Sequence, residues 1–286
     1  MTEKAPETSL TDRIKDLSAY GGFGTLLLYL FGYLALRFHI TALGIVTDLG
    51  VLDERYLFAG ARFFVFLGFC LPLLALIGLP AALLTKFIFD RRPHLWKVMF
   101  RPTALLWFSL IFALAMIQTW MNACLSLSDL PLAARLPEPR WLAEILRKHD
   151  TIDVTIFFLA LLLCGGAVSW PVIAVSRLPL HSRGLKALFG ASALMAALTV
   201  LLIPVNFGMV VMPYNMERTA AIGKVSLAAG QQAWLLWEGK EWMTYFVKSA
   251  GGVSIVAVPV KEIDRIEVKG IDSLFDVLYG SPGGRK

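Results

Sequence analysis

Charged residues are scarce in this sequence. Asp, Glu, Lys and Arg together make up only 17% of its 286 residues, whereas 57% are hydrophobic. The mean hydropathy is +0.66, well above the value of an ordinary soluble domain. The composition therefore excludes a typical soluble globular protein and indicates a membrane protein.

Cysteine and histidine are also rare, which limits the chemistry that the chain can perform. The three cysteines, Cys70, Cys124 and Cys164, lie in apolar stretches without CxxC spacing, so we interpret them as small buried hydrophobic residues. The four histidines lie at the ends of apolar stretches or in loops, whereas haem and zinc sites need paired or clustered ligands. The sequence also lacks a phosphate-binding loop, a nucleophile elbow and a zinc-protease motif. We therefore expect no cofactor, no metal and no enzymatic activity.

Long apolar runs are what the sequence has instead. Five of them are nearly free of charge, and each approaches or exceeds the roughly 18 to 20 residues that cross a bilayer. The predicted spans cover residues 19–40, 56–84, 103–125, 154–176 and 187–213. The first span is the weakest, because Arg37 lies inside it. The polar segment 1–18 is not followed by a cleavage site, so the first span is not expected to be a removable signal.

Basic residues gather in two connections between the spans, residues 86–102 and 177–186. Short basic connections of this kind stay in the cytoplasm. This rule places the amino terminus in the cytoplasm and, after five spans, residues 214–280 outside it. We therefore expect a multi-pass protein of the inner (cytoplasmic) membrane with a periplasmic carboxy-terminal domain.

The same basic connections account for the net charge of +6, so nucleic acid is not an expected partner. Arg91, Arg92 and Lys97 are expected to attract anionic lipid headgroups on the cytoplasmic side. A less favoured interpretation places Asp90 and His94 in a lipid-modifying site.

After residue 213 the pattern changes to short runs rich in Val, Ile and aromatic residues, separated by turn signals. Gly239 is expected to be the first residue of a type II′ hairpin turn. Strict alternation over 264–269 predicts a strand, and 271–280 predicts a short helix. Residues 281–286 are expected to fray. The fold class is therefore an all-α polytopic bundle of five transmembrane helices followed by a small all-β domain, either an SH3-like or Sm-like barrel or an open meander sheet.

Aromatic residues in the β-domain exceed what one core face of a small sheet requires, so some are expected to meet the membrane, another subunit or a partner. They are Trp234, Trp237, Trp242, Tyr245 and Phe246. An amphipathic segment at residues 137–148 is expected to lie on the membrane surface, with its apolar side chains facing lipid. Those side chains are Trp141, Leu142, Ile145 and Leu146.

Three amides lie at matching depth inside the spans. Gln118 and Asn122 share a face of the third span, and Asn206 lies in the fifth. We expect them to form a hydrogen bond between the two spans, worth on the order of 0.5 to 2 kcal/mol. The alternative is a polar patch in a permeation path.

Two arginines, Arg37 and Arg62, lie within the spans near the end that faces the β-domain. An unpaired guanidinium inside the membrane costs roughly 2.5 kcal/mol or more, so each should reach outward or find a carboxylate. The connection between the first two spans offers Asp48, Asp53 and Glu54. The alternative is an anion or lipid-headgroup site.

The fifth span has a smooth face formed by Gly190, Ala193 and Ala197. Such a face lets a second helix pack closely, and it also suits a pore wall, with Pro204 and Asn206 near a constriction. The expected function is a non-catalytic, oligomeric scaffold or accessory subunit of a membrane complex, either a homo-oligomer or a heteromeric assembly. A channel lined by the fifth span is the alternative, and a lipid-modifying enzyme is the second alternative.

Overall fold

The computed structural model describes residues 10–45, 54–91, 101–127, 140–263 and 265–280. In these ranges five helices are long and apolar enough to cross a membrane, so the chain is a multi-pass membrane protein and the predicted fold class is confirmed. The five helices are α1 (Leu10–Ala42), α2 (Glu54–Arg91), α4 (Pro102–Leu127), α6 (Thr151–Ser176) and α7 (Arg183–Asn206). Helix α1 begins inside the polar segment 1–18, and α2 extends past residue 84, the predicted end of the second span.

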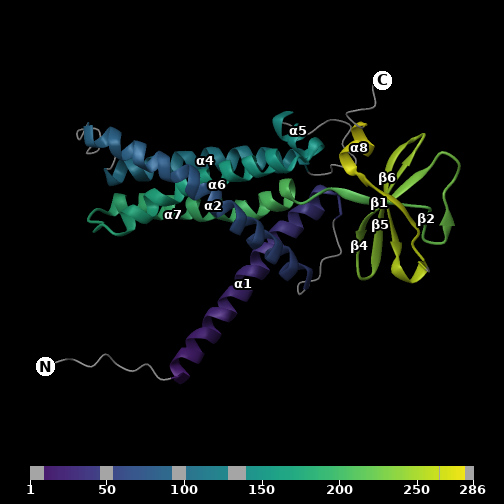
Figure 1. Ribbon diagram of the computed structural model, residues 1–286, viewed down its shortest axis with the longest axis horizontal. Coiled ribbons are helices and arrows are strands. Elements are labelled where there is room, and N and C mark those ends of the chain that lie inside the picture. The colour runs from purple at the N-terminus through teal and green to yellow at the C-terminus, as the bar shows by residue number, and fades with distance from the viewer. Residues whose placement is uncertain (1–9, 46–53, 92–100, 128–139, 264, 281–286) are drawn as a thin grey trace.

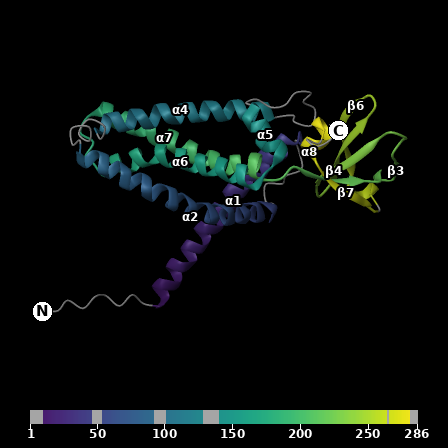
Figure 2. The same ribbon diagram turned by 45° about the horizontal axis from the view of Figure 1, so that its top comes forward.

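Helices α4, α6 and α7 lie side by side and form the main bundle. Helix α1 crosses this bundle obliquely and contacts it only through its carboxy-terminal half, while its amino-terminal half extends away (Figure 1). The side chains of Tyr20 and Phe23 are accordingly 74% and 60% exposed. Figure 2 shows α2 running along one side of the bundle, and most of the described side chains in its second half are exposed.

Glycines allow the backbones of α1 and α2 to touch where the helices cross. A Cβ atom built at Gly32 would overlap the Tyr56 carbonyl, and one built at Gly60 would overlap the backbone of Leu28. The same crossing is covered by Tyr56, whose ring packs edge-on against Tyr29 and Tyr33 at centroid distances of 5.3 and 5.2 Å. Close approach of this kind maximises van der Waals contact where no hydrophobic drive exists between helices.

Buried serines, rather than the predicted amides, link the main bundle. Ser109 Oγ of α4 donates to the Val168 carbonyl of α6 at 2.6 Å, and Ser192 Oγ of α7 donates to the Leu106 carbonyl of α4 at 3.0 Å. Both serines are completely buried. These bonds satisfy hydroxyl groups inside the membrane domain and fix α4 against its two neighbours.

The predicted hydrogen bond between the third and fifth spans is wrong. Gln118 Nε2 donates at 3.4 Å to Asn122 Oδ1 on the exposed face of α4, and Asn206 Nδ2 donates at 2.6 Å to the Leu202 carbonyl of its own helix. Asn206 is fully buried. The prediction relied on the equal depth of the three amides in the membrane. The rotation of each helix about its axis instead turns Gln118 and Asn122 to the exposed face and Asn206 to the interior.

The fifth spanning helix ends in a short π-helix, η2 (Phe207–Val211). Pro204 has no N–H to donate to the preceding turn, a common cause of irregular helix geometry. Residues 204–210 are all buried. Pro204 and Asn206 therefore pack inside this chain, which contradicts the interpretation that they face a pore between copies.

The carboxy-terminal domain is an open antiparallel sheet in the order β6-β5-β4-β1-β7, with a separate β2-β3 ribbon. The strands are β1 (Asn215–Thr219), β2 (Ala221–Ile222), β3 (Val225–Ser226), β4 (Gln232–Glu238), β5 (Trp242–Ser249), β6 (Gly252–Pro259) and β7 (Val268–Ser273), and η3 (Val260–Glu262) and α8 (Leu274–Tyr279) complete the domain. The last strand lies further along the chain than the alternation over 264–269 predicts. Strand β1 was not expected, and it lies between β4 and β7.

The predicted type II′ turn at Gly239 is also wrong. A register shift between Leu235 and Trp237 adds one residue to β4. The two loop residues are therefore Lys240 and Glu241, and the loop is closed by the Gly239 N–H, which donates to the Trp242 carbonyl at 2.9 Å. The bulge thus moved the turn by one position.

Both faces of the sheet are buried, which explains its many aromatic residues. Trp234 and Phe246 pack on the face toward the helices. Tyr245 packs on the other face with Met243 and Val247, beneath side chains from β2, β6 and η3. The expectation of surplus exposed aromatics is corrected accordingly, because Trp234, Tyr245 and Phe246 are all at most 2% exposed. Trp242, at 45% exposure, fits it, and Trp237 is half-buried.

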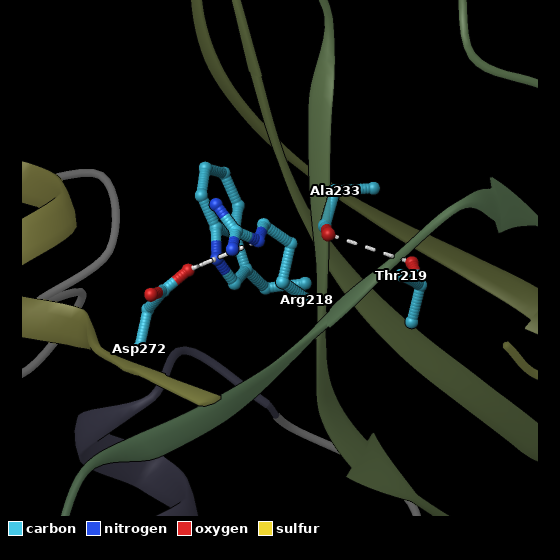
Figure 3. Close-up of polar contacts among 5 residues, drawn as sticks. Arg218, Thr219, Ala233 and Asp272 are labelled. Atoms are coloured by element: carbon cyan, nitrogen blue, oxygen red, sulfur yellow. Dashed lines mark hydrogen bonds and ion pairs between the residues drawn. The ribbon is translucent and has the colours of Figure 1, made fainter. Parts of the chain in front are cut away.

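A buried polar contact fixes Trp234 in the sheet. Its Nε1 donates to Asp272 Oδ2 at 2.7 Å. Figure 3 shows Asp272 turned toward Arg218, whose Nε lies 3.7 Å from the same carboxylate oxygen, and Thr219 Oγ1 donates to the Ala233 carbonyl beside it. These contacts join β4, β1 and the edge strand β7.

The short helix α5 (Arg140–Lys148) forms where an amphipathic segment was expected, but its apolar face does not meet lipid. Leu142 and Leu146 are buried in the protein core, and only Trp141 is largely exposed. Arg147 Nη2 donates to the Gly280 carbonyl at the end of α8, at 2.9 Å. Helix α5 is therefore a packing element between the bundle and the β-domain.

Candidate functional site

The junction between the helices and the β-domain combines a shared hydrophobic core, buried side-chain hydrogen bonds and a cavity. One continuous hydrophobic core crosses it. That core includes Ile40 of α1, Phe63 of α2, Phe158 of α6, Phe207 and Val210 of η2, Met216 of β1, Trp234 of β4, Phe246 of β5 and Phe275 of α8. One face of the sheet and the membrane domain thus share a packed interior, while the other face of the sheet has its own cluster.

Two side chains supply hydrogen-bond donors that the π-helix lacks at its end. In the i→i+5 pattern the Gly208 carbonyl would accept from residue 213, which is Pro213 and has no N–H. His39 Nδ1 lies 2.9 Å from this carbonyl and must carry the proton, because a carbonyl only accepts. Tyr214 Oη donates to the Met209 carbonyl at 2.7 Å. Both carbonyls are therefore satisfied.

His39 and Tyr214 also pack against each other, with ring centroids 4.7 Å apart. Tyr214 continues the stack to Phe275 of α8 at 5.5 Å. Burial raises the pKa of the Tyr214 phenol above its ordinary value, so the group stays neutral and keeps its donor proton. This stack connects α1, the end of η2 and α8 in one contact chain.

Arg55, in the first turn of α2, forms a second connection to the sheet. Its Nη1 donates to the Glu238 carbonyl at 2.7 Å, and its guanidinium lies over the Trp237 ring at 5.0 Å from the ring centroid. A bond to a charged donor and a cation–π contact both restrict the guanidinium to one orientation.

A cavity of about 390 Å³ opens beside Arg55 at this junction. Its walls come from α1, α2, the segment after η2, β1 and β4. Arg62 lines the cavity together with Arg55, and no carboxylate of the described ranges does. A second cavity, of about 380 Å³, adjoins it, shares Arg55 and Trp237, and is also lined by Glu217 and Glu238. The first cavity therefore combines arginine side chains with an apolar wall, whereas acidic residues line the second.

The two arginines that the sequence places within the spans, Arg37 and Arg62, lie in different surroundings. Arg62 lines the cavity, but Arg37 is half-buried on another side of α1 and does not. In the described parts of the chain neither forms an ion pair with a carboxylate. The predicted partners Asp48 and Asp53 lie outside the described residues.

Of the smooth face predicted for the fifth span, only Ala193 packs within the chain, against the cluster around Ala113 and Val168. Gly190 and Ala197 are exposed and Ala193 is half-buried. The inward face of α7 consists of Ser192, Ala196 and Thr199 instead.

Of the predicted headgroup-binding residues, Arg91 is exposed and stacks over Phe87 at 4.1 Å. Arg92 and Lys97 lie outside the described residues, as does His94. The side chain of Asp90 is likewise not described.

Several residues of the junction escaped the sequence analysis, among them His39, Arg55, Tyr214 and Gly208. The cavity residues come partly from the membrane helices and partly from the β-domain, which are far apart in the sequence. No spacing within one segment therefore connects them. The one available signal was Pro213, which marks a carbonyl in need of a donor from elsewhere. No family model, curated protein or solved structure matches this chain.

Proposed function

We propose that this protein is a non-catalytic scaffold or accessory subunit of a membrane complex, which holds its β-domain at a fixed position above the bilayer. The observation that carries this proposal is the continuous core between the helices and the sheet. A flexibly tethered domain would have a linker and its own separate interior. Here the fixed position supports a role in presenting the sheet to other components.

The basic connections support a periplasmic location for the β-domain. The end of α2 and the turn between α6 and α7 lie at the end of the bundle opposite the sheet (Figure 1). Arg177, Arg183 and Lys186 are exposed there. By the positive-inside rule that end faces the cytoplasm, so we place the protein in the inner membrane with its sheet outside.

The outward faces of the bundle support assembly with a second copy. Gly190 and Ala197 leave a shallow surface on α7, and the exposed Gln118–Asn122 pair lies on α4. Small and polar side chains at a lipid-facing surface favour contact with another helix over contact with acyl chains. We therefore propose a homo-oligomer as the simplest assembly.

Replacing Ala197 with leucine tests the proposed assembly. Because Ala197 is exposed, the larger side chain should leave the fold intact but separate the packed helices. We expect the dimer or higher oligomer dissociation constant, measured by native mass spectrometry in lipid, to rise about tenfold, as loss of close helix packing worth about 1 to 2 kcal/mol would produce.

Ala196→Leu is the matched control, because Ala196 is only 6% exposed and packs inside the chain. This variant should lower the unfolding midpoint without any selective effect on assembly. Unchanged oligomer mass in Ala197→Leu would contradict assembly through α7, and an ionic current from reconstituted protein would favour the channel alternative.

A further inference from the structure

We propose that the junction cavity binds the phosphate of an anionic phospholipid in the leaflet next to the β-domain. This site lies at the opposite end of α2 from the basic connection. The inference does not rest on assembly of the protein, because every wall of the cavity comes from one chain.

The charge of the cavity selects an anion. Arg55 and Arg62 are seven residues apart on α2, which places them on one face of the helix about 10 Å apart along its axis. Both line the cavity, and among the described residues its lining contains no carboxylate. Planar guanidinium groups bind phosphate oxygens in pairs of charge-assisted hydrogen bonds. Arg62 thus offers contact to a phosphate group, and Arg55 adds positive charge beside it.

The orientation of Arg55 prepares it for a ligand. Its bond to the Glu238 carbonyl and its stacking on Trp237 occupy part of the guanidinium and hold it against the sheet. Asn215, at the start of β1, lines the same cavity and adds an amide. A ligand therefore meets a donor group whose side-chain entropy is already reduced.

The depth and the walls of the cavity favour a lipid over a free anion. Arg62 lies two turns inside the spanning part of α2, where an unpaired guanidinium is costly. From this depth the long side chain reaches outward to the headgroup region, where lipid phosphate is the abundant anion. Leu36, Phe58 and Ala59 form an apolar wall next to Arg62, and such a wall suits the glycerol and upper acyl chain of a lipid.

The test measures the first lipid bound by the purified full chain in neutral detergent. Native mass spectrometry during a titration with phosphatidylglycerol gives its dissociation constant. We expect Arg62→Gln to raise this constant about tenfold, because a charge-assisted hydrogen bond to phosphate is lost. Arg62→Lys keeps the charge but cannot form the paired hydrogen bonds. Its dissociation constant should therefore lie between those of the unchanged protein and Arg62→Gln.

Arg140→Gln is the matched control, because Arg140 is an exposed arginine on the same side of the membrane and outside the cavity. It should bind the first lipid as the unchanged protein does. A second readout needs no variant: the unchanged protein should prefer phosphatidylglycerol to phosphatidylcholine, and glycerol phosphate and inorganic phosphate should displace the lipid only weakly.

Three results would overturn the proposal. The first is equal lipid affinity in Arg62→Gln and the unchanged protein. The second is equal affinity for phosphatidylglycerol and phosphatidylcholine. The third is displacement of the lipid by inorganic phosphate at comparable concentration. That result would show that the cavity binds free anions and is not a lipid site.

Discussion

Gly208→Ala is expected to prevent the fifth helix from seating against α1. A Cβ atom at this position would overlap the backbone of Ala35, and backbone cannot move aside as a flexible side chain can. Gly208 is also the residue whose carbonyl accepts from His39. We expect the free energy of unfolding to fall by about 3 kcal/mol or more, at the upper end of the range for overpacked cores.

Unfolding of the full chain in detergent, followed by near-ultraviolet circular dichroism, measures this effect. Gly166→Ala in α6 is the control, because a Cβ there has no neighbour within 4 Å. That variant should be neutral or slightly stabilising, since alanine is the better helix former. Equal stability of the two variants would show that α1 and η2 are not in backbone contact.

His39→Ala is expected to loosen the β-domain from the helices. Without the imidazole the buried Gly208 carbonyl loses its donor, and Tyr214 loses the ring on which it packs. An unsatisfied buried carbonyl costs about 1 to 3 kcal/mol, and the lost ring adds a cavity term of about 1 kcal/mol or more. Hydrogen exchange should then rise together in η2 and β1.

His181→Ala is the control for this prediction. His181 makes the same kind of bond, from Nδ1 to the Pro179 carbonyl at 2.9 Å, but in an exposed turn where water replaces it. Its exchange pattern should match that of the unchanged protein. Unaltered exchange in η2 and β1 of His39→Ala would contradict the junction described above.

The five spans were predictable because length and apolarity alone determine them. The residues at which helices touch were not. The sequence favours Gly190 as a packing glycine, whereas the structure uses Gly32, Gly60 and Gly208. The crossing point of two helices depends on their tilt and rotation in three dimensions, so no spacing within one helix reveals it.

The aromatic residues of the β-domain show a similar limit. Their excess over one core face was visible in the sequence, but its interpretation assumed a sheet covered on one side only. The β2-β3 ribbon and η3 cover the second face, so Tyr245 became a core residue. Short strands such as Ala221–Ile222 carry too few residues for alternation to show.

The candidate site was half predictable. The cost of an arginine inside a span drew attention to Arg62, and the anion site was one of the two alternatives. Arg55 is at a helix start, where a basic residue is unremarkable, and Trp237 lies far along the chain in the sheet. Only the docking of the sheet on the helices brings Arg55 and Trp237 together.

The most direct test of the central claim is the side of the membrane on which the sheet lies. In a cysteine-free background, Glu241→Cys places one exposed thiol in the loop between β4 and β5, and Ser182→Cys places one at the opposite end of the bundle. A membrane-impermeant maleimide added to intact spheroplasts should label the cysteine at 241 and reach the cysteine at 182 only after lysis. Labelling of the cysteine at 182 alone would contradict the proposed orientation and the role built on it.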